Sequence, residues 1–268
     1  MQFIYCLAII LLLFSCTTKI HLPNRQPNSI TGTQFYKQAF SYNWQQRDSL
    51  AVKEILAGNM PSFLKKFVGV TTQIQDSASG RTIKATYYVS PDYVSIGSNS
   101  DWARIPLTPM AAQKIADAFD CFLPTRKIVN DIYNNAKLKL EPVPMYAFRD
   151  STPTMYHHHL IIEGQRKSQK GLVAGIKKDV VITGKILREA KQNRVAIYGW
   201  HKPDGKPIQP LYSGHVNWYV DYSHGIRLVY RKIKVGNKWL DYMDVVKNPV
   251  LQKLLCDEEY CDFYKYPY

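Results

Sequence analysis

The chain has 268 residues, of which 46% are hydrophobic and 13% aromatic, so its composition excludes an intrinsically disordered protein. Lysine and arginine outnumber aspartate and glutamate by 35 to 21, which gives a formal net charge of +14. Basic residues scattered along a chain favour anionic surroundings in general, but no nucleic-acid-binding motif is present, and nucleic acid is not expected as a partner.

A short apolar run over residues 3–14 ends at the motif LFSC. The run is too short to span a membrane as a helix and has the length of the apolar part of a signal peptide. LFSC resembles the bacterial lipobox, whose cysteine carries lipid, although Phe14 is bulky for that motif and no Lys or Arg precedes the run. The resemblance implies a signal peptide over 1–15, a lipid anchor on Cys16 and a tether over 16–32. It also implies a cell-envelope location at the outer membrane, because no aspartate follows the cysteine. An ordinary cleaved signal peptide or an uncleaved anchor is the alternative.

Three further cysteines follow the lipobox-like motif. The oxidising compartment of an exported protein would allow Cys256 and Cys261 to pair across the sequence CDEEYC. Cys121 lies on the apolar face of a predicted helix, which favours a buried, unreactive thiol over a nucleophile.

The first half of the chain alternates between helical and strand patterns. Capping residues and apolar periodicity predict helices over 33–57, 60–67, 108–119 and 123–136. Runs of β-branched and aromatic residues predict strands over 68–75, 81–90, 93–98 and 103–107, the first two forming a hairpin. A proline-rich segment then marks the only internal boundary, near residue 141.

The second half is richer in strands. Strand patterns occur over 177–186, 194–201, 217–223 and 225–235, and helical patterns over 156–169, 241–248 and 249–255. We therefore expect an α+β fold, with a helical N-terminal part that includes a hairpin, followed by a mostly antiparallel sheet with flanking short helices. Residues 33–141 and 142–268 would form two subdomains or one continuous domain.

Six of the seven histidines lie between His157 and His224. His201, His215 and His224 are predicted at strand ends or turns together with Asp221, which is where sites are usually built. These three histidines could bind zinc, with Asp221 as a ligand or an orienting group. Without metal, His224 would act as a general base while Asp221 fixes its tautomer. A structural turn held by Asp221 and its neighbours is the third alternative.

The sequence SHGIRL, residues 223–228, resembles the L,D-transpeptidase box, in which a Ser-His-Gly-Cys-x-Arg run carries the nucleophile and a histidine lies upstream. Ser223, His224 and Arg227 match in type, and His215 is upstream. The cysteine is absent because Ile226 follows Gly225, so the resemblance implies a cell-wall substrate but no thiol chemistry.

Four residues are expected to help bind substrate. Arg227 and Lys178 would stabilise negative charge, while Trp200 and Tyr222 would form the walls of a pocket. The function expected from these residues is that of a cell-envelope hydrolase or transferase acting on peptidoglycan or another anionic surface polymer. The alternative is a non-catalytic envelope lipoprotein that binds the cell wall or a protein partner.

A helical segment outside this region carries a second polar group. His159, Glu163 and Arg166 are spaced so that they meet on one side of a helix. Glu163 could serve as an acid or base there, but an exposed salt-bridged stripe is the commoner arrangement.

Overall fold

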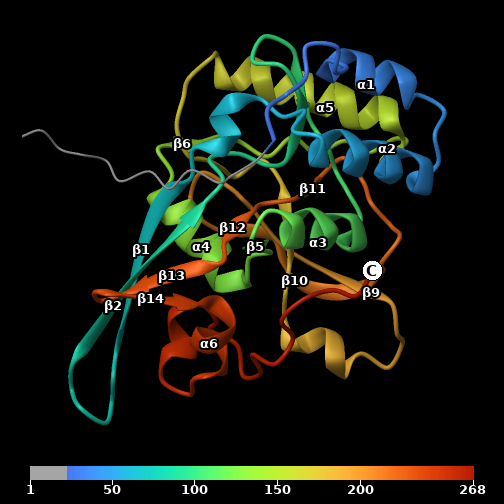
Figure 1. Ribbon diagram of the computed structural model, residues 1–268. Helices are drawn as coiled ribbons and strands as arrows, with labels where there is room; N and C mark the ends of the chain where they lie inside the picture. The colour runs from blue at the N-terminus through green and yellow to red at the C-terminus, as the bar shows by residue number, and fades with distance from the viewer. Residues whose placement is uncertain (1–22) are drawn as a thin grey trace, which may run out of the picture.

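The computed structural model in Figure 1 describes residues 23–268. The predicted signal peptide, the lipidation at Cys16 and the first part of the tether lie outside these residues. Within them, helices alternate with mostly antiparallel strands, which confirms the predicted α+β class. The described part of the chain contains no helix that is long and apolar enough to cross a membrane.

The first half of the structure follows the predicted elements closely. One predicted helix is split in two, because Thr31 and Asn43 each begin a helix with a reciprocal capping box. The elements are α1 (Gly32–Gln38), α2 (Trp44–Leu56), the 3₁₀ helix η1 (Ser62–Lys65), β1 (Val68–Gln75), β2 (Thr82–Val89), β3 (Ser95–Gly97), β4 (Trp102–Arg104), α3 (Pro109–Ala118), β5 (Cys121–Phe122), α4 (Arg126–Asn135) and β6 (Leu138–Lys139).

The second half begins with the longest helix and continues with short strands. Its elements are α5 (Thr152–Arg166), β7 (Val173–Ala174), β8 (Lys178–Val181), η2 (Gly184–Arg188), β9 (Arg194–His201), β10 (Pro207–Val216), β11 (His224–Gly225), β12 (Val229–Tyr230), β13 (Lys232–Val235), β14 (Lys238–Asp241), α6 (Tyr242–Lys247) and η3 (Leu251–Leu254). The strand predicted over 217–223 is absent, since this segment is a loop of turns between β10 and β11.

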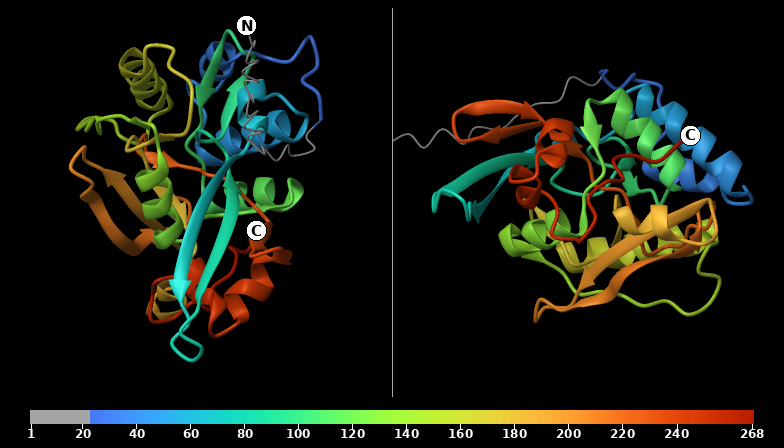
Figure 2. Two further views of the ribbon diagram at one scale, coloured as in Figure 1. Left: turned by 90° about the vertical axis from the view of Figure 1, so that its left-hand side faces the viewer. Right: turned by 90° about the horizontal axis from the view of Figure 1, so that it is seen from below.

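Two sheets organise the molecule. The larger has the order β14-β13-β2-β12-β5, with β1 paired to β2, and the distal end of the β1–β2 hairpin projects from the body in Figures 1 and 2. The smaller has the order β10-β9-β8-β11. Its β8–β11 pair is parallel, whereas β8–β9 and β9–β10 are antiparallel.

Strands from both sides of residue 141 share the larger sheet, because β2 pairs with β12 and β13. One continuous apolar core likewise extends from Phe35 in α1 to Tyr266 near the C-terminus. The boundary predicted near residue 141 therefore does not separate two cores.

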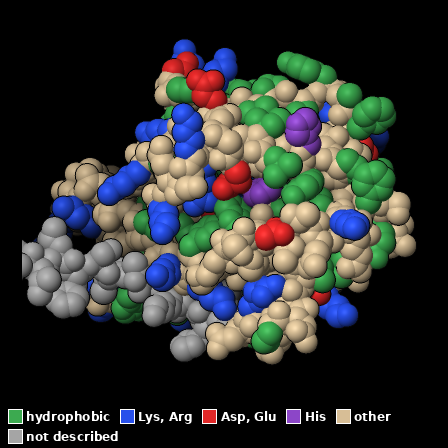
Figure 3. Space-filling model, turned by 90° about the horizontal axis from the view of Figure 1, so that it is seen from above, with side chains coloured by type: hydrophobic (Ala, Val, Ile, Leu, Met, Phe, Trp, Pro, Cys, Tyr) green, Lys and Arg blue, Asp and Glu red, His purple; other side chains and the backbone are tan. Residues whose placement is uncertain are grey.

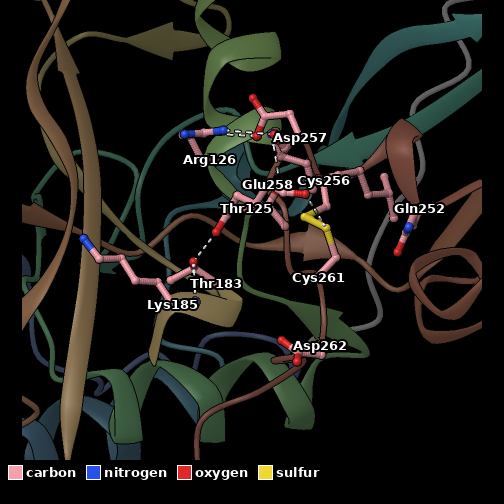
Figure 4. The surroundings of a disulfide bond; sticks show 12 residues. Thr125, Arg126, Thr183, Lys185, Gln252, Cys256, Asp257, Glu258, Cys261 and Asp262 are labelled. Atoms are coloured by element: carbon pink, nitrogen blue, oxygen red, sulfur yellow. Dashed lines mark hydrogen bonds and ion pairs between the residues drawn. A yellow bond between two sulfur atoms is a disulfide. The ribbon is translucent and has the colours of Figure 1, made fainter. Parts of the chain in front are cut away.

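A disulfide joins Cys256 and Cys261, as the spacing allowed, and Figure 4 shows the loop that it closes. The main-chain carbonyl and carboxylate of Asp257 in this loop accept hydrogen bonds from Arg126, and Glu258 accepts one from Thr183. The disulfide thus closes a loop that is hydrogen-bonded to Arg126 at the start of α4 and to Thr183 just after β8. Cys121 is free and buried, and burial raises the pKa of its thiol well above the ordinary value, which fits an unreactive side chain.

Candidate functional site

His224 is positioned by the short parallel strand β11, which pairs with the start of β8. His224 lies opposite Lys178, and the Lys178 amide donates a 2.7 Å hydrogen bond to the carbonyl of Ser223. Gly225 permits this close packing, because a Cβ there would lie 2.5 Å from the ring of Tyr93. The residues that flank the histidine thus fix its main chain at the edge of the smaller sheet, against β8.

Asp221 occupies the turn before β11 and is 1% exposed. Its Oδ1 accepts hydrogen bonds from the Ser223 amide at 2.8 Å and the Ser223 hydroxyl at 2.5 Å. Its Oδ2 accepts from Arg149 at 2.9 Å and from the Tyr219 hydroxyl at 3.3 Å. Burial alone would raise the pKa of Asp221, but protonated His224, these hydrogen bonds and nearby Lys178 outweigh burial and hold the pKa well below its ordinary value. Asp221 is therefore a fixed, ionised carboxylate, and Ser223 is a hydroxyl committed to it rather than a free nucleophile.

The imidazole of His224 is buried next to this carboxylate. Its Nε2 lies 4.0 Å from Oδ1 of Asp221, and neither ring nitrogen has a hydrogen-bond partner among residues 23–268. Burial lowers the pKa of His224 to about 4, despite the attraction of Asp221. The ring is consequently neutral at physiological pH and retains a nitrogen lone pair that can accept a proton.

Five side chains form what we call the His224 cluster: His224, Asp221, Lys178, His215 and Tyr219. The His215 ring lies 6.4 Å and the Tyr219 ring 5.9 Å from the His224 ring, measured between centroids. Lys178 is 7% exposed and its Nζ lies 5.1 Å from the centroid of Trp200. Burial lowers the pKa values of both Lys178 and His215. The cluster thus combines a neutral base, an ionised carboxylate and a cation.

His201 does not join the cluster. It stacks on Tyr133 of α4 at 4.5 Å, and its Nε2 lies 3.0 Å from Oδ1 of Asn130. Trp200 and Gly199 both have positive φ values, of 57° and 105°, at this end of β9; Trp200 contacts Lys178, whereas His201 faces α4.

The predicted zinc ligands His201, His215 and His224 are therefore not brought together. Among residues 23–268 no group of three His, Cys, Asp or Glu side chains is arranged to hold a metal ion. His224 and Asp221, the pair invoked by the metal-free interpretation, do lie side by side.

Three of the predicted substrate-binding residues are instead structural. Arg227 is fully buried and donates to the carbonyls of Ser90 and Val173, at 2.9 and 2.7 Å. Tyr222 is 1% exposed, and its hydroxyl accepts a hydrogen bond from the main chain of Met145. Trp200 is buried against Tyr222, with ring centroids 6.3 Å apart. Of the predicted set, only Lys178 lies in the His224 cluster.

Lys177, which precedes Lys178, is a buried lysine next to the cluster. Nζ of Lys177 donates to the carbonyl of Tyr222 and lies 3.2 Å from Nδ1 of His158. Burial, reinforced by Arg104, lowers the pKa of Lys177 to about 7. His158, on α5, has its own pKa lowered, first by burial and then by Lys177. These groups support the turn at Tyr222.

The segment 141–151 was also missed as part of the site. Arg149 from this segment forms the ion pair with Asp221, and its carbonyl accepts from the Tyr222 amide at 2.9 Å. The sequence marked the segment only as a proline-rich boundary, and nothing in its composition indicated that Arg149 returns to a turn 72 residues later.

The chain was compared with protein-family models, with characterised proteins and with solved structures, and nothing matched.

Proposed function

We propose that this protein is a cell-envelope lipoprotein that hydrolyses or transfers bonds in peptidoglycan or another anionic surface polymer, with His224 as general base. The observation that carries the proposal is the imidazole of His224, which is neutral, buried beside ionised Asp221 and unpaired at both nitrogens. Buried polar groups are nearly always hydrogen-bonded, so this ring is available for a partner that comes from outside the chain.

The reaction follows from the positions of three side chains. His224 takes a proton from water or a substrate hydroxyl, whose oxygen then bonds to the carbon under attack. Asp221, 4.0 Å from Nε2, stabilises the imidazolium that forms, and Lys178 stabilises negative charge on the substrate oxygen. The imidazolium then gives its proton to the leaving nitrogen or oxygen as the scissile bond breaks.

Access to the base requires a movement. His224 is only 1% exposed, and the 141–151 segment is held over Asp221 by the Arg149 ion pair. In this proposal the segment opens to admit substrate and closes to exclude water from the reaction.

The net charge of the protein favours an anionic substrate. The face in Figure 3 carries dispersed Lys and Arg side chains with few acidic ones among them, in keeping with the net charge of +14. Attraction of this kind raises the local concentration of an anionic polymer without specifying its sequence. The envelope location itself rests on the lipobox-like motif at Cys16.

The test is release of soluble fragments from purified cell-wall sacculi. We expect release by the wild type and by His157→Gln, a control that alters an exposed histidine of α5. For His224→Gln we expect a loss of about 100-fold or more, the contribution typical of a general base. The wild-type rate should fall only below about pH 4, where His224 becomes protonated.

Three results would overturn the proposal. Release by His224→Gln at the wild-type rate would show that His224 is not the general base. Loss of release when a chelator is added would show that a metal is required. Co-sedimentation with sacculi without any release would identify the alternative, a non-catalytic lipoprotein that binds the wall.

A further inference from the structure

Four large, exposed aromatic side chains belong to the two segments that contact the His224 cluster, and we call them the aromatic rim: Tyr146 (90% exposed), Phe148 (80%), Tyr212 (41%) and Trp218 (50%). Tyr146 and Phe148 are the two most exposed large hydrophobic side chains among residues 23–268. Exposed apolar groups that gather beside a polar site mark a binding surface.

Two members of the rim come from β10 and the loop that follows it. The ring of Tyr212 contacts the ring of His215 edge to face, with centroids 5.0 Å apart. Gly214 makes room for this ring, because a Cβ there would lie 2.4 Å from the Tyr212 hydroxyl. Trp218 directly precedes Tyr219, whose hydroxyl donates to Asp221. Both rings are therefore tied to the cluster through their own segment.

The other two members come from the 141–151 segment. Phe148 directly precedes Arg149, which binds Asp221, and Tyr146 directly follows Met145, whose amide donates to the Tyr222 hydroxyl. Phe148 also adopts a left-handed backbone with φ of 47°, which is costly for an aromatic residue. Two segments far apart in the sequence thus contribute exposed rings next to residues that contact Asp221 or Tyr222.

The chemistry of the rim suits a sugar chain. A pyranose ring has an apolar face of C–H groups that can stack on an aromatic ring, while its hydroxyls need polar partners. Arg149, which directly follows Phe148 and whose side chain is 43% exposed, supplies a charged hydrogen-bond donor beside the rim. We propose that the aromatic rim binds the glycan strand of an anionic cell-wall polymer and thereby places a bond of that polymer at His224. This inference rests on the proposed function for the reacting bond, but the binding surface itself is separable from catalysis.

The test measures the affinity of the full chain for glycan strands from which the stem peptides have been removed, with free stem peptides as the comparison ligand. We expect Trp218→Ala and Phe148→Ala each to weaken glycan binding by about tenfold, as truncation of an aromatic anchor does. The matched control is Trp239→Ala, because Trp239 is also 50% exposed but lies on β14, outside the rim. Melting temperatures of the three variants should stay close to that of the wild type.

The outcomes separate this inference from the proposed function. Normal glycan binding by His224→Gln, together with weakened binding by Trp218→Ala, supports the rim whether or not any bond is cleaved. Equal effects of Trp218→Ala and Trp239→Ala on glycan affinity would contradict the proposal that the aromatic rim is the binding surface. Binding of free stem peptides in place of peptide-free glycan would overturn it as well, even if sacculi were still hydrolysed.

Discussion

Asp179 offers a quantitative check on the electrostatics next to the His224 cluster. It follows Lys178 on β8 and is 3% exposed. The Tyr93 hydroxyl donates to its Oδ2 at 2.9 Å, while Oδ1 has no hydrogen-bond partner in the described part of the chain. Burial raises the pKa of Asp179 from 3.8 to about 7, because Arg227 and the Tyr93 hydrogen bond offset only part of the desolvation.

The sign of the effect on stability follows from linkage. A carboxyl whose pKa is higher in the folded state favours folding less as it ionises, so stability is lost as the pH rises from about 4 through about 7. With pKa values of 3.8 unfolded and about 7 folded, the penalty is roughly 2 kcal/mol at pH 5 and roughly 4 kcal/mol at pH 8. The wild type should therefore lose about 2 to 3 kcal/mol of unfolding free energy over this interval through Asp179 alone.

Asp179→Asn removes the titration while keeping an acceptor for Tyr93. We expect the variant to become more stable relative to the wild type by about 2 to 3 kcal/mol between pH 5 and pH 8. Urea unfolding followed by circular dichroism at both pH values measures this difference. The control is Asp244→Asn, at an exposed carboxylate of α6. Its unfolding free energy should change between pH 5 and pH 8 by the same amount as that of the wild type. If the unfolding free energy of Asp179→Asn also changed with pH as that of the wild type does, the assignment of a raised pKa to this carboxyl would be refuted.

Three further predictions concern the rest of the fold. Replacing Cys256 and Cys261 together by serine should lower the unfolding free energy by about 2 kcal/mol, the entropic contribution of so short a loop, and chemical denaturation of the oxidised protein and the variant measures it. Cys121, at 4% exposure, should react with a thiol reagent only after unfolding, so rapid labelling of the native protein would contradict its burial. Arg104→Met removes the closest partner of the buried Asp92 carboxylate, to which only the longer ion pair with Arg166 at 3.5 Å remains, and should cost about 3 to 5 kcal/mol. Arg231→Met, at a pair whose arginine is 46% exposed, should cost less than about 1 kcal/mol, and similar losses for both arginine variants would contradict this distinction.

Local signals in the sequence predicted most elements because each depended on neighbouring residues. Thr108 and Thr125 cap α3 and α4 as expected, and the hairpin pairs Val68 with Val89 through to Gln75 with Thr82. The strand predicted over 217–223 failed because its alternating apolar residues belong to a turn whose hydrogen bonds end on Asp221.

Long-range contacts explain what the sequence could not predict. His159, Glu163 and Arg166 do meet on α5, but Arg104 enters between them and pairs with Glu163 at 2.8 Å, so the expected exposed stripe is a largely buried network. His201 is likewise separated from His224 because it packs on Tyr133 and Asn130 of α4. Periodicity indicates which residues of a strand share a face, but not which side chains of other elements they meet.

The sequence left a turn and a catalytic site as competing explanations for Asp221, Ser223 and His224, and the structure contains features of both. The turn satisfies Asp221 with four donors and commits the Ser223 hydroxyl. Neither the turn nor any other part of residues 23–268 supplies a hydrogen bond to the His224 ring. Leaving a buried polar group unpaired costs about 1 to 3 kcal/mol. A turn selected only for stability would gain from an apolar side chain at this position. The histidine is better explained if its partner is water or substrate, so that the turn holds the carboxylate in place and the ring remains available for a proton.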